Sequence, residues 1–345
     1  MKTAIFAYKG ETLPKNTTLP DREMLFDEVR ERGIDPVVSL QGERSFDSTG
    51  VETHHLIDGH TLASYRHTAL DRTGVIVNRL DRIFKVMPDE WTGADLPIIN
   101  QNALRSLVFR KQRVADEVFT PLGIGMPNRL IESVSDVQEF VDEFGIHDLI
   151  TKPNSGTHSK GVESRTAQEL LALPIEALLE KPTIIQPKYD FTIPFSDEIR
   201  PYDATSAEAF KGWGESTAVK EFRIYTFKDP ESVTTFPVAR AMHEGTDHWL
   251  FVDPESIPQK LHDQSVAAAE AAARITGSRA IFAALDFGYG ARADEAPDYH
   301  AVELNGRMPY LIGSDKHPGV ARALRRLFAD QIKHTADSSI PSVKQ

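Results

Sequence analysis

The chain has 345 residues, which corresponds to two or three structural units at about 100–200 residues per domain. Hydrophobic residues make up 40% of the sequence and charged residues 26%, a balance typical of a globular protein with a buried core. The formal net charge of -12 argues against nucleic acid as the main partner, because phosphate binding requires a clustered Lys/Arg surface. The absence of cysteine excludes disulfides, thiolate nucleophiles and Cys-ligated metals. No apolar stretch suits a membrane span or a signal peptide, so we expect a cytoplasmic protein that binds no membrane.

Short apolar runs alternate with polar segments in the first hundred residues. This pattern predicts a helix over residues 21–32 and strands over residues 3–8, 36–40, 74–78 and 96–99. Strands that alternate with helices are typical of a parallel sheet covered by helices. We therefore expect residues 1–100 to form a small α/β domain.

The periodicity changes after residue 101 to a mixture of helices and antiparallel strands. Helices are predicted over residues 104–122, 135–144, 264–276 and 319–333, and strands over residues 149–152, 183–186, 221–226, 236–241, 281–287 and 299–304. Ser135 is the expected N-cap of the second helix, and Gly277 is expected to end the third. Residues 189–219 lack periodicity, so they form either a lid or binding loop without regular structure or a disordered surface insertion.

Three polar side chains lie in two apolar runs near the C-terminus. Asp286 is expected at the end of one strand, and Glu303 and Asn305 lie in the next. Because side chains alternate along a strand, Glu303 and Asn305 face one side while Val302 and Leu304 face the core. Hard oxygen donors of this kind, two of them anionic, suit Mg²⁺ with phosphates and water completing its shell. Each residue alone is more simply a solvated strand-end polar group, so the assignment depends on two further features.

The first of these is a loop of small residues at 150–162. Lys152 ends an apolar strand, and Gly156 and Gly161 have the spacing of the outer glycines of a P-loop. Val162 follows where a Walker A motif requires Lys, so that motif is excluded. The first βα turn has no G-x-G-x-x-G, which weakens a dinucleotide site. A Gly/Ser loop alone is more often a plain turn, but with a Lys it can also bind phosphate.

The second feature is a series of cations inside or beside the β-rich apolar runs. Its members are Lys111, Lys152, Arg223, Arg240 and Arg307. Lys and Arg are usually solvated surface charges, but a triphosphate under cleavage requires several positive charges around it. Cations in such apolar surroundings therefore favour a phosphate-binding function.

From about residue 100 to 327 the order of these segments resembles the ATP-grasp superfamily. Within it, the similarity is to the carboxylate–amine ligase branch, which includes glutathione synthetase and ribosomal-protein glutamate ligase. The matching segments are Phe-Arg-Lys-Gln at 109–112, Ile-Thr-Lys-Pro-Asn-Ser-Gly at 150–156, Ile-Ile-Gln-Pro-Lys-Tyr at 184–189, Glu-Phe-Arg-Ile-Tyr at 221–225, Ala-Leu-Asp-Phe at 284–287 and Val-Glu-Leu-Asn-Gly-Arg-Met-Pro at 302–309. The resemblance implies an α/β and α+β chain: a Rossmann-like pre-ATP-grasp domain at 1–100, a small central lobe at 101–188 and a C-terminal lobe with the metal site at 189–340.

The resemblance also implies a role for each matching residue. ATP would be bound by Lys111, Lys152, Ser155, Gly156, Lys160, Gly161, Gln186, Pro187, Lys188 and Tyr189. Mg²⁺, with Mn²⁺ as the alternative, would be bound by Asp286, Glu303 and Asn305, and the catalytic residues would be Arg223 and Arg307. Pro187 stands where the family usually has an acidic residue, and only Asp190 and Glu198 are candidates for its ribose-binding acid.

The implied activity is that of an ADP-forming ligase that joins a carboxylate to an amine. The carboxylate attacks the γ-phosphate to give an acyl-phosphate, and the amine then displaces phosphate from the acyl carbon. The substrates would be small molecules or peptides, and a homodimer remains open. Two other functions also remain open: an ATP-grasp kinase with a hydroxyl acceptor, and a non-catalytic nucleotide-binding protein.

Overall fold

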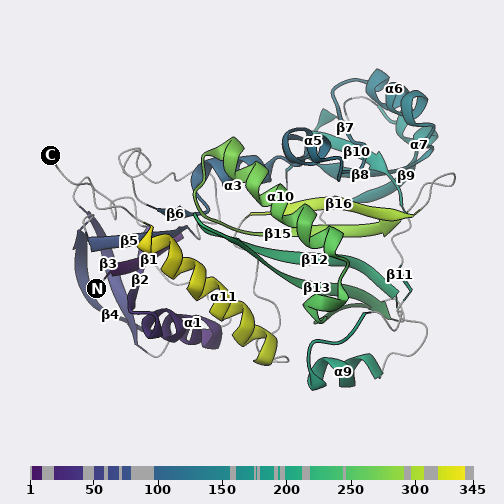
Figure 1. The fold of residues 1–345 in the computed structure, drawn as a ribbon. Helices are drawn as coiled ribbons and strands as arrows, with labels where there is room; N and C mark the ends of the chain where they lie inside the picture. Colours follow the sequence, from purple (N-terminus) through teal and green to yellow (C-terminus); the bar gives the residue numbers. More distant parts are fainter. Residues whose placement is uncertain are drawn as a thin grey trace.

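Three sheets make up the described part of the chain (Figure 1). The computed structural model describes residues 2–9, 19–41, 50–57, 61–69, 72–78, 97–155, 161–174, 176, 179–189, 193–194, 199–211, 218–243, 246–290, 297–306 and 318–338. The N-terminal sheet and a small four-stranded sheet lie at opposite ends of the molecule, with a larger antiparallel sheet between them. None of the helices in these residues has the length and apolar character needed to cross a membrane.

The N-terminal sheet has the order β4-β3-β2-β1-β5-β6. Its strands are β1 (Lys2–Lys9), β2 (Ile34–Gln41), β3 (Gly50–Ile57), β4 (Thr61–Ala69), β5 (Thr73–Asn78) and β6 (Ile98–Ile99). The predicted strands pair in parallel, β1 with β2 and β5, and β5 with β6. The sheet also contains an antiparallel hairpin, β3 and β4, which the sequence pattern did not predict. The side-chain hydroxyls of Thr53 and Thr68 are buried in this hairpin, with their oxygens 2.7 Å apart. Because polar side chains occupy these buried positions, the hairpin lacks the continuous row of apolar residues by which its strands could be recognised in the sequence.

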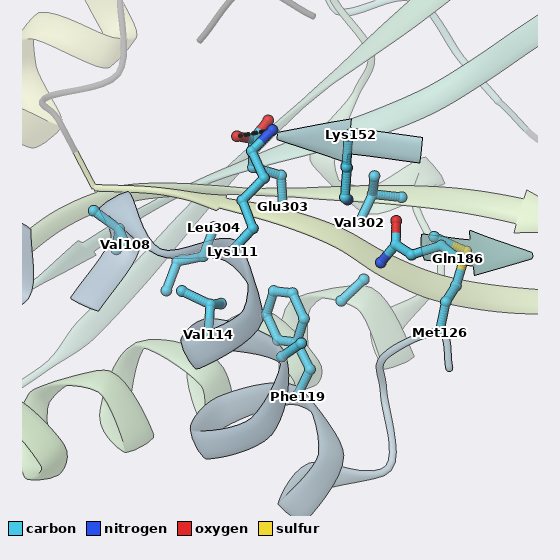
Figure 2. Close-up of a pocket in the computed structure, with 12 residues that line it drawn as sticks. Val108, Lys111, Val114, Phe119, Met126, Lys152, Gln186, Val302, Glu303 and Leu304 are labelled. Carbon is cyan, nitrogen blue, oxygen red and sulfur yellow. Dashed lines mark ion pairs between the residues drawn. The ribbon is translucent and has the colours of Figure 1, made fainter. Parts of the chain in front are cut away.

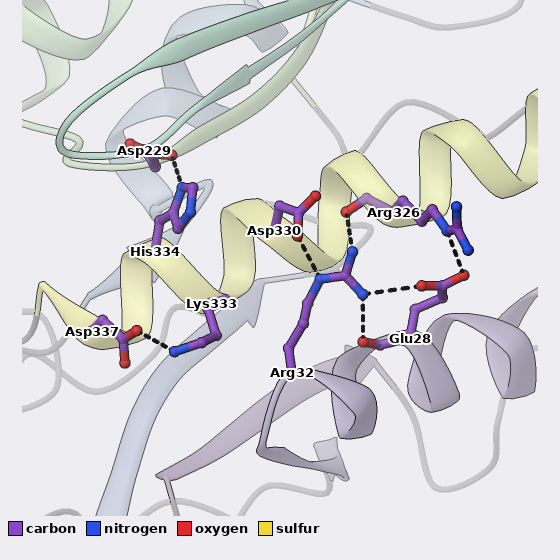
Figure 3. Close-up of polar contacts among 8 residues, drawn as sticks. All are labelled: Glu28, Arg32, Asp229, Arg326, Asp330, Lys333, His334 and Asp337. Atoms are coloured by element: carbon purple, nitrogen blue, oxygen red, sulfur yellow. Dashed lines mark hydrogen bonds and ion pairs between the residues drawn. The ribbon is translucent and has the colours of Figure 1, made fainter.

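Helix α11 (Pro318–Asp337) packs against helix α1 (Leu19–Glu31) beside the N-terminal sheet (Figure 3). One hydrophobic core joins Phe26 of α1, Phe328 of α11 and Phe282 of the central sheet. The predicted boundary at residue 100 therefore separates elements that share a core. Arg32 reinforces the contact: its Nε donates to Asp330 Oδ1 (2.6 Å), and its Nη1 donates to Glu28 Oε2 (3.0 Å).

We expect Arg32→Ala to lower the free energy of unfolding by about 2 kcal/mol, because it removes two charge-assisted hydrogen bonds from a shielded guanidinium. Arg30→Ala is the matched control on the same helix, since the Arg30 side chain is 43% exposed and the Arg32 side chain 17%. Arg30 pairs with the exposed Asp27, so its loss is expected to change the free energy by less than about 0.5 kcal/mol. Urea denaturation of both variants measures the difference, and equal losses would contradict a special role for Arg32.

The central sheet has the order β14-β13-β12-β15-β16, and β11 (Ile193–Pro194) also pairs with β12. Its strands are β12 (Ala218–Lys228), β13 (Val233–His243), β14 (Thr246–Leu250), β15 (Ile281–Gly290) and β16 (Asp298–Asn305). The predicted antiparallel pairings β12–β13 and β15–β16 are confirmed. Helix α10 (Gln259–Thr276) packs its alanines on the sheet and ends at Gly277 with φ of 66°, as predicted. A short 3-10 turn, Pro254–Ser256, precedes it.

The small sheet has the order β7-β10-β8-β9, and its neighbouring strands are antiparallel. Its strands are β7 (Arg129–Ile131), β8 (Asp148–Pro153), β9 (Glu163–Thr166) and β10 (Thr183–Pro187), and helices α6 (Val134–Phe144) and α7 (Ala167–Leu171) share its core. Ser135 is not the N-cap of α6. Ser133 takes that place because its N–H (2.6 Å) and its hydroxyl (2.9 Å) both donate to Asp136, the third residue of the helix.

Two further predictions are corrected in the helical parts of the chain. The single helix expected over 104–122 is divided into α3 (Asn102–Phe109), α4 (Lys111–Val114), the π-helical turn Ala115–Phe119 and α5 (Thr120–Leu122). The break lies at Arg110, whose backbone is extended (φ -104°, ψ 101°). Residues 189–219 contain helix α9 (Ala204–Lys211), so an unstructured connection is wrong for that part. Asp203 caps this helix, since its Oδ1 accepts from the N–H of Ser206 (2.8 Å).

Candidate functional site

A pocket with about 340 Å³ of open space lies between the small sheet, β16 and the helical segment at residues 102–122 (Figure 2). Apolar side chains form most of its wall, and three charged side chains and one amide complete it. The lining residues are Val108, Lys111, Val114, Ala115, Phe119, Met126, Lys152, Gln186, Ala301, Val302, Glu303 and Leu304. An apolar chamber with a charged end suits a ligand that has a flat apolar part and an anionic tail.

The small sheet contributes Lys152 and Gln186 to the pocket. Gln186 is the register partner of Ile150, which stands two residues before Lys152 on β8. Cross-strand partners and residues two apart share a face, so Lys152 and Gln186 both point away from the core under α6 and α7. Each is 6% exposed. The strand pairing therefore places Lys152 and Gln186 on the same face of the small sheet, where both are buried in the wall of the pocket.

Lys111 reaches the same end of the pocket from α4. The turn after Lys152 is attached to this helix, because the N–H groups of Lys111 and Gln112 donate to the main-chain and side-chain oxygens of Asn154, both at 2.9 Å. Lys111 Nζ lies 3.5 Å from Glu303 Oε1. Burial and, to a smaller extent, the charge of Lys111 lower the pKa of Lys152, the charge of Glu303 opposes them, and the resulting pKa is about 8. Two cations held this close, one of them desolvated, form a site prepared for an anion.

A row of charged residues crosses three adjacent strands of the central sheet. Arg223 on β12 is the register partner of Asp286 on β15, which in turn is the partner of Glu303 on β16. Arg223 Nε and Nη2 donate to the two oxygens of Asp286 at 2.7 and 2.8 Å, and Asn305 Nδ2 donates to Oδ2 at 2.9 Å. Burial alone would lower the pKa of Arg223, but the hydrogen bonds and charge of Asp286 outweigh it and raise that pKa. Arg223 is therefore a permanent cation with a fixed orientation.

Burial has the opposite effect on the carboxyl partner in this row. Asp286 is 3% exposed. Its burial raises the pKa of the carboxyl, hydrogen bonds from Arg223 oppose this, and the nearby charge of Glu303 adds to it. A further cation beside Asp286 and Glu303 would relieve the repulsion between the two carboxylates.

The structure brings Asp286, Glu303 and Asn305 together, and their donor chemistry fits Mg²⁺. They supply two carboxylates and one amide oxygen from paired strands, and hard oxygens are the ligands this ion prefers. Within the described part of the chain, no three His, Cys, Asp or Glu side chains form a metal-binding group, so an ion held by Asp286 and Glu303 would need Asn305 and oxygens of a bound ligand as further donors. Asn305 turns its N–H toward Asp286, and ligation requires its oxygen to face the ion instead.

Two expectations about this segment are wrong. Asp286 lies inside β15, which continues to Gly290, and not at the end of the strand. Val302 lines the pocket instead of the core, because a bulge interrupts the pairing: Glu303 faces Asp286, whereas Ala301 faces the next residue, Phe287. The bulge leaves Val302 as the additional residue in β16 and turns it toward the pocket.

Of the other predicted site residues, five are described but do not line this pocket, and the rest lie outside the described residues. Ser155 is exposed. Gly161, at the other end of the loop, has a positive φ of 76°. Pro187 ends β10. The N–H of Lys188 donates to Asp148 O (2.9 Å), and the Tyr189 ring stacks on His300 with centroids 5.0 Å apart. Outside the described residues lie Gly156, Lys160, Asp190, Glu198 and Arg307.

The apolar wall of the pocket could not be predicted from the sequence. Val108 and Val114 occupy apolar positions of the predicted helix, where they are indistinguishable from core residues. Phe119 enters the pocket from the π-helical turn, which departs from the period of 3.6 residues. Met126 follows the end of the helical segment and carries no pattern. The glycine before it, Gly125, lies close to Phe119, since a Cβ at that position would be 2.7 Å from Phe119 Cβ.

No protein-family model and no curated protein matches the sequence. The structure, in contrast, is similar to solved structures of ligases over nearly its whole length. The VanG D-Ala:D-Ser ligase from Enterococcus faecalis aligns with a TM-score of 0.62 at 11% identity, over 98% of this chain and 99% of that one. The ATP-grasp ligase PsnB, complexed with minimal precursor, Mg and ADP, aligns with a TM-score of 0.54 at 16% identity, over 95% and 98%.

A third solved structure is the macrocyclase MdnC from Microcystis aeruginosa MRC bound with its precursor peptide MdnA. It aligns with a TM-score of 0.57 at 13% identity, over 95% of this chain and 98% of that one. Similarity at such low identity concerns the arrangement of helices and strands, because unrelated activities can share one fold. The chain therefore has the fold of the ATP-grasp ligases.

Proposed function

We propose that this chain is an ADP-forming ligase that activates a carboxylate with ATP and joins it to an amine. The observation that carries the proposal is one continuous arrangement of charge. Lys111 and Lys152 lie at the end of an apolar pocket, and Lys111 contacts Glu303, the last member of the Arg223–Asp286–Glu303 row. A nucleotide pocket that leads directly to two carboxylates and a fixed guanidinium suits phosphoryl transfer.

The chain's own side chains supply most of the functions that this reaction needs. The apolar wall accepts the adenine, where the Gln186 amide can hydrogen-bond the base. Lys111 and Lys152 bind phosphate oxygens, and Arg223, held in place by Asp286, stabilises the transferring phosphoryl group. Asp286, Glu303 and Asn305 would hold Mg²⁺, which neutralises phosphate charge when bound.

In the proposed reaction, a carboxylate oxygen of the first substrate attacks the γ-phosphorus and the bond to the β-phosphate oxygen breaks, releasing ADP. The amine nitrogen of the second substrate then attacks the acyl carbon. Phosphate leaves with the oxygen that bridged it to carbon, and the amine loses its proton. Neither step requires a covalent nucleophile from the protein, which agrees with a chain that has no cysteine.

The similar structures support magnesium, a nucleotide and a peptide or amino-acid substrate. PsnB was solved with Mg, ADP and a precursor, MdnC with a precursor peptide, and VanG is named for D-Ala and D-Ser. We therefore place the carboxylate and the amine of this chain among amino acids and peptides. A cytoplasmic location is part of the proposal, because ATP is the energy source.

The experiment incubates the protein with Mg²⁺, ATP and pools of ¹⁸O-carboxylate amino acids or peptides plus amines. A ligase releases ADP and free phosphate in equal amounts, and the phosphate carries one ¹⁸O from the carboxylate. ADP without free phosphate in the presence of hydroxyl acceptors would indicate a kinase instead. A thermal-shift titration with ATP, with and without Mg²⁺, precedes the assay. If ATP does not raise the melting temperature under either condition, the proposed function is wrong.

A further inference from the structure

Asn100, in the turn between β6 and α3, has a backbone conformation that residues other than glycine rarely adopt. Its φ is 59°, and its side chain is completely buried. Asn is among the few residues that tolerate this region, because its short amide can hydrogen-bond nearby backbone. A buried, left-handed Asn is retained only where its surroundings hold it firmly.

The side-chain amide of Asn100 bonds to β15 and to Gly306, the residue that directly follows β16. Nδ2 donates to the carbonyl oxygens of Phe282 (2.7 Å) and Gly306 (3.2 Å), and Oδ1 accepts from the N–H of Phe282 (2.8 Å). The β15–β16 pairing stops at Ala284 and Asn305. Beyond this point β16 no longer pairs with β15. The Asn100 amide therefore bonds to both backbone groups of Phe282, in the place of a residue from a neighbouring strand.

A buried network holds Asn100 itself in place. Its N–H donates to Ala280 O (3.2 Å), and its carbonyl accepts from Asn78 Nδ2 (2.9 Å) at the end of β5. Arg105 on α3 donates to Asn78 Oδ1 (3.2 Å). The turn is thus attached to the N-terminal sheet, to α3 and to β15, so the position of its amide is fixed from three sides.

Gly306 is confined between this amide and the pocket wall. A Cβ at Gly306 would lie 2.9 Å from Val108 Cγ1 and 3.1 Å from Cγ2, closer than a side chain can approach without displacement. Gly306 directly follows Asn305, whose side chain bonds to Asp286. The backbone that sets the direction of the Asn305 side chain is therefore held by Asn100 on one side and by Val108 on the other.

We infer that Asn100 is a positioning residue for the metal site: it fixes Gly306 and the end of β16, and through them the side chain of Asn305. The inference rests on the proposed function, since it takes Asn305 as a metal ligand. Asn100 is not among the residues that line the nucleotide pocket. Its loss is therefore expected to weaken the binding of nucleotide with Mg²⁺ while leaving the binding of nucleotide alone unchanged.

The test is isothermal titration with ADP, in Mg²⁺ and in EDTA, of the wild type and of Asn100→Gly. Glycine accepts the positive φ without strain and removes only the amide. The wild type should bind ADP more tightly in Mg²⁺ than in EDTA. Asn100→Gly should keep the EDTA affinity within about twofold and lose about tenfold or more of the enhancement by Mg²⁺, the usual cost of losing an outer-shell partner of a metal ligand.

Gln101→Ala is the matched control at the next position of the same turn. Gln101 Nε2 donates to Thr276 O (3.0 Å), so this variant removes one partly buried amide hydrogen bond that does not lead to Gly306. It should keep both affinities. Loss of the enhancement in Gln101→Ala to the same degree would show a general loosening of the turn and would overturn the inference.

Gly306→Ala displaces the same backbone from the Val108 side. This variant replaces Asn100→Gly in the test if Asn100→Gly does not fold. It is expected to lose the enhancement by Mg²⁺ in the same way. A full enhancement in Asn100→Gly, or in Gly306→Ala where the first variant is unfolded, overturns the inference and leaves the proposed function standing. A wild type that binds no ADP under either condition overturns both.

Discussion

Asp286→Asn is expected to lower Mg²⁺-dependent ADP release on the order of 1,000-fold, the equivalent of about 4 kcal/mol of lost charge stabilisation. Asn has nearly the same shape, but it lacks the negative charge that a metal and Arg223 both require. The same substitution leaves a buried guanidinium opposite a neutral group, and Asp286 itself is 3% exposed. We therefore also expect the free energy of unfolding to fall by about 3 kcal/mol, as for other broken buried ion pairs.

Glu303→Gln separates catalysis from stability in this prediction. Glu303 contacts Lys111 at 3.5 Å, and its side chain is 33% exposed, so this pair has the strength of a surface ion pair. Activity should fall about as far as in Asp286→Asn, while the free energy of unfolding should change by less than about 1 kcal/mol. ADP release and urea denaturation of both variants check this. An active Asp286→Asn enzyme would remove Asp286 from the metal site.

Lys152→Met is expected to act in opposite directions on binding and on stability. It removes a desolvated ammonium from the phosphate end of the pocket, so ATP affinity should fall about 100-fold. It also removes a charge that the folded protein holds unfavourably, because burial lowers the pKa of Lys152 from 10.5 to about 8. At pH 7 the nucleotide-free variant should therefore be more stable than the wild type by up to about 3 kcal/mol.

The lowered pKa of Lys152 also predicts how the stability difference between Lys152→Met and the wild type changes with pH. Below pH 8 the Lys152 side chain is charged in both states, so the folded protein bears the full penalty. Between about pH 8 and 10.5 the folded state releases its proton first, and the stability of the wild type rises relative to that of the variant. The stability difference between Lys152→Met and the wild type should therefore shrink from pH 7 to pH 10 in urea denaturation. A variant less stable than the wild type at pH 7 would contradict the prediction.

Lys111→Met is the matched control for Lys152→Met. It removes the other pocket lysine, whose side chain is 15% exposed and contacts Glu303. ATP affinity should fall here as well, but no gain in stability is expected, because an ion pair is lost with the charge. A gain in stability from both substitutions would mean that repulsion between the two lysines, and not the burial of Lys152, sets the penalty.

Local pattern was sufficient for the part of the candidate site that lies within short stretches of chain. Alternation along β16 places Glu303 and Asn305 on one face, and the adjoining strand brings Asp286 opposite them. The apolar run before the Gly-rich loop likewise predicts that Lys152 lies near the end of a strand, which is β8. In each case the neighbours in space are neighbours in sequence or in one hairpin, so residue type and period carry the information.

Tertiary contacts decided everything that joins distant segments. The contact between Lys111 and Glu303 joins α4 to β16, which lie far apart in the sequence. The bulge that turns Val302 into the pocket and the π-helical turn that admits Phe119 are departures from regular strand and helix, which residue periodicity does not predict. The Asn100 network is the extreme case. The side chain of Asn100 bonds to Phe282 of β15 and to Gly306 after β16, its backbone carbonyl accepts from Asn78 of β5, and Asn78 accepts from Arg105 of α3. Hydrogen bonds between remote parts of a chain leave no periodic signal in either part.

By itself, the sequence determined the donor chemistry of this protein: the carboxylates, lysines and glycines available to bind a phosphorylated ligand, and the strands that present them. Strand alternation and glycine spacing are local properties, so they can be derived without the fold. Only the tertiary structure decided which apolar side chains line the pocket and which buried amide bonds to Gly306, the residue after Asn305. Those choices follow from packing between lobes, where the free energy of a residue depends on partners far along the chain.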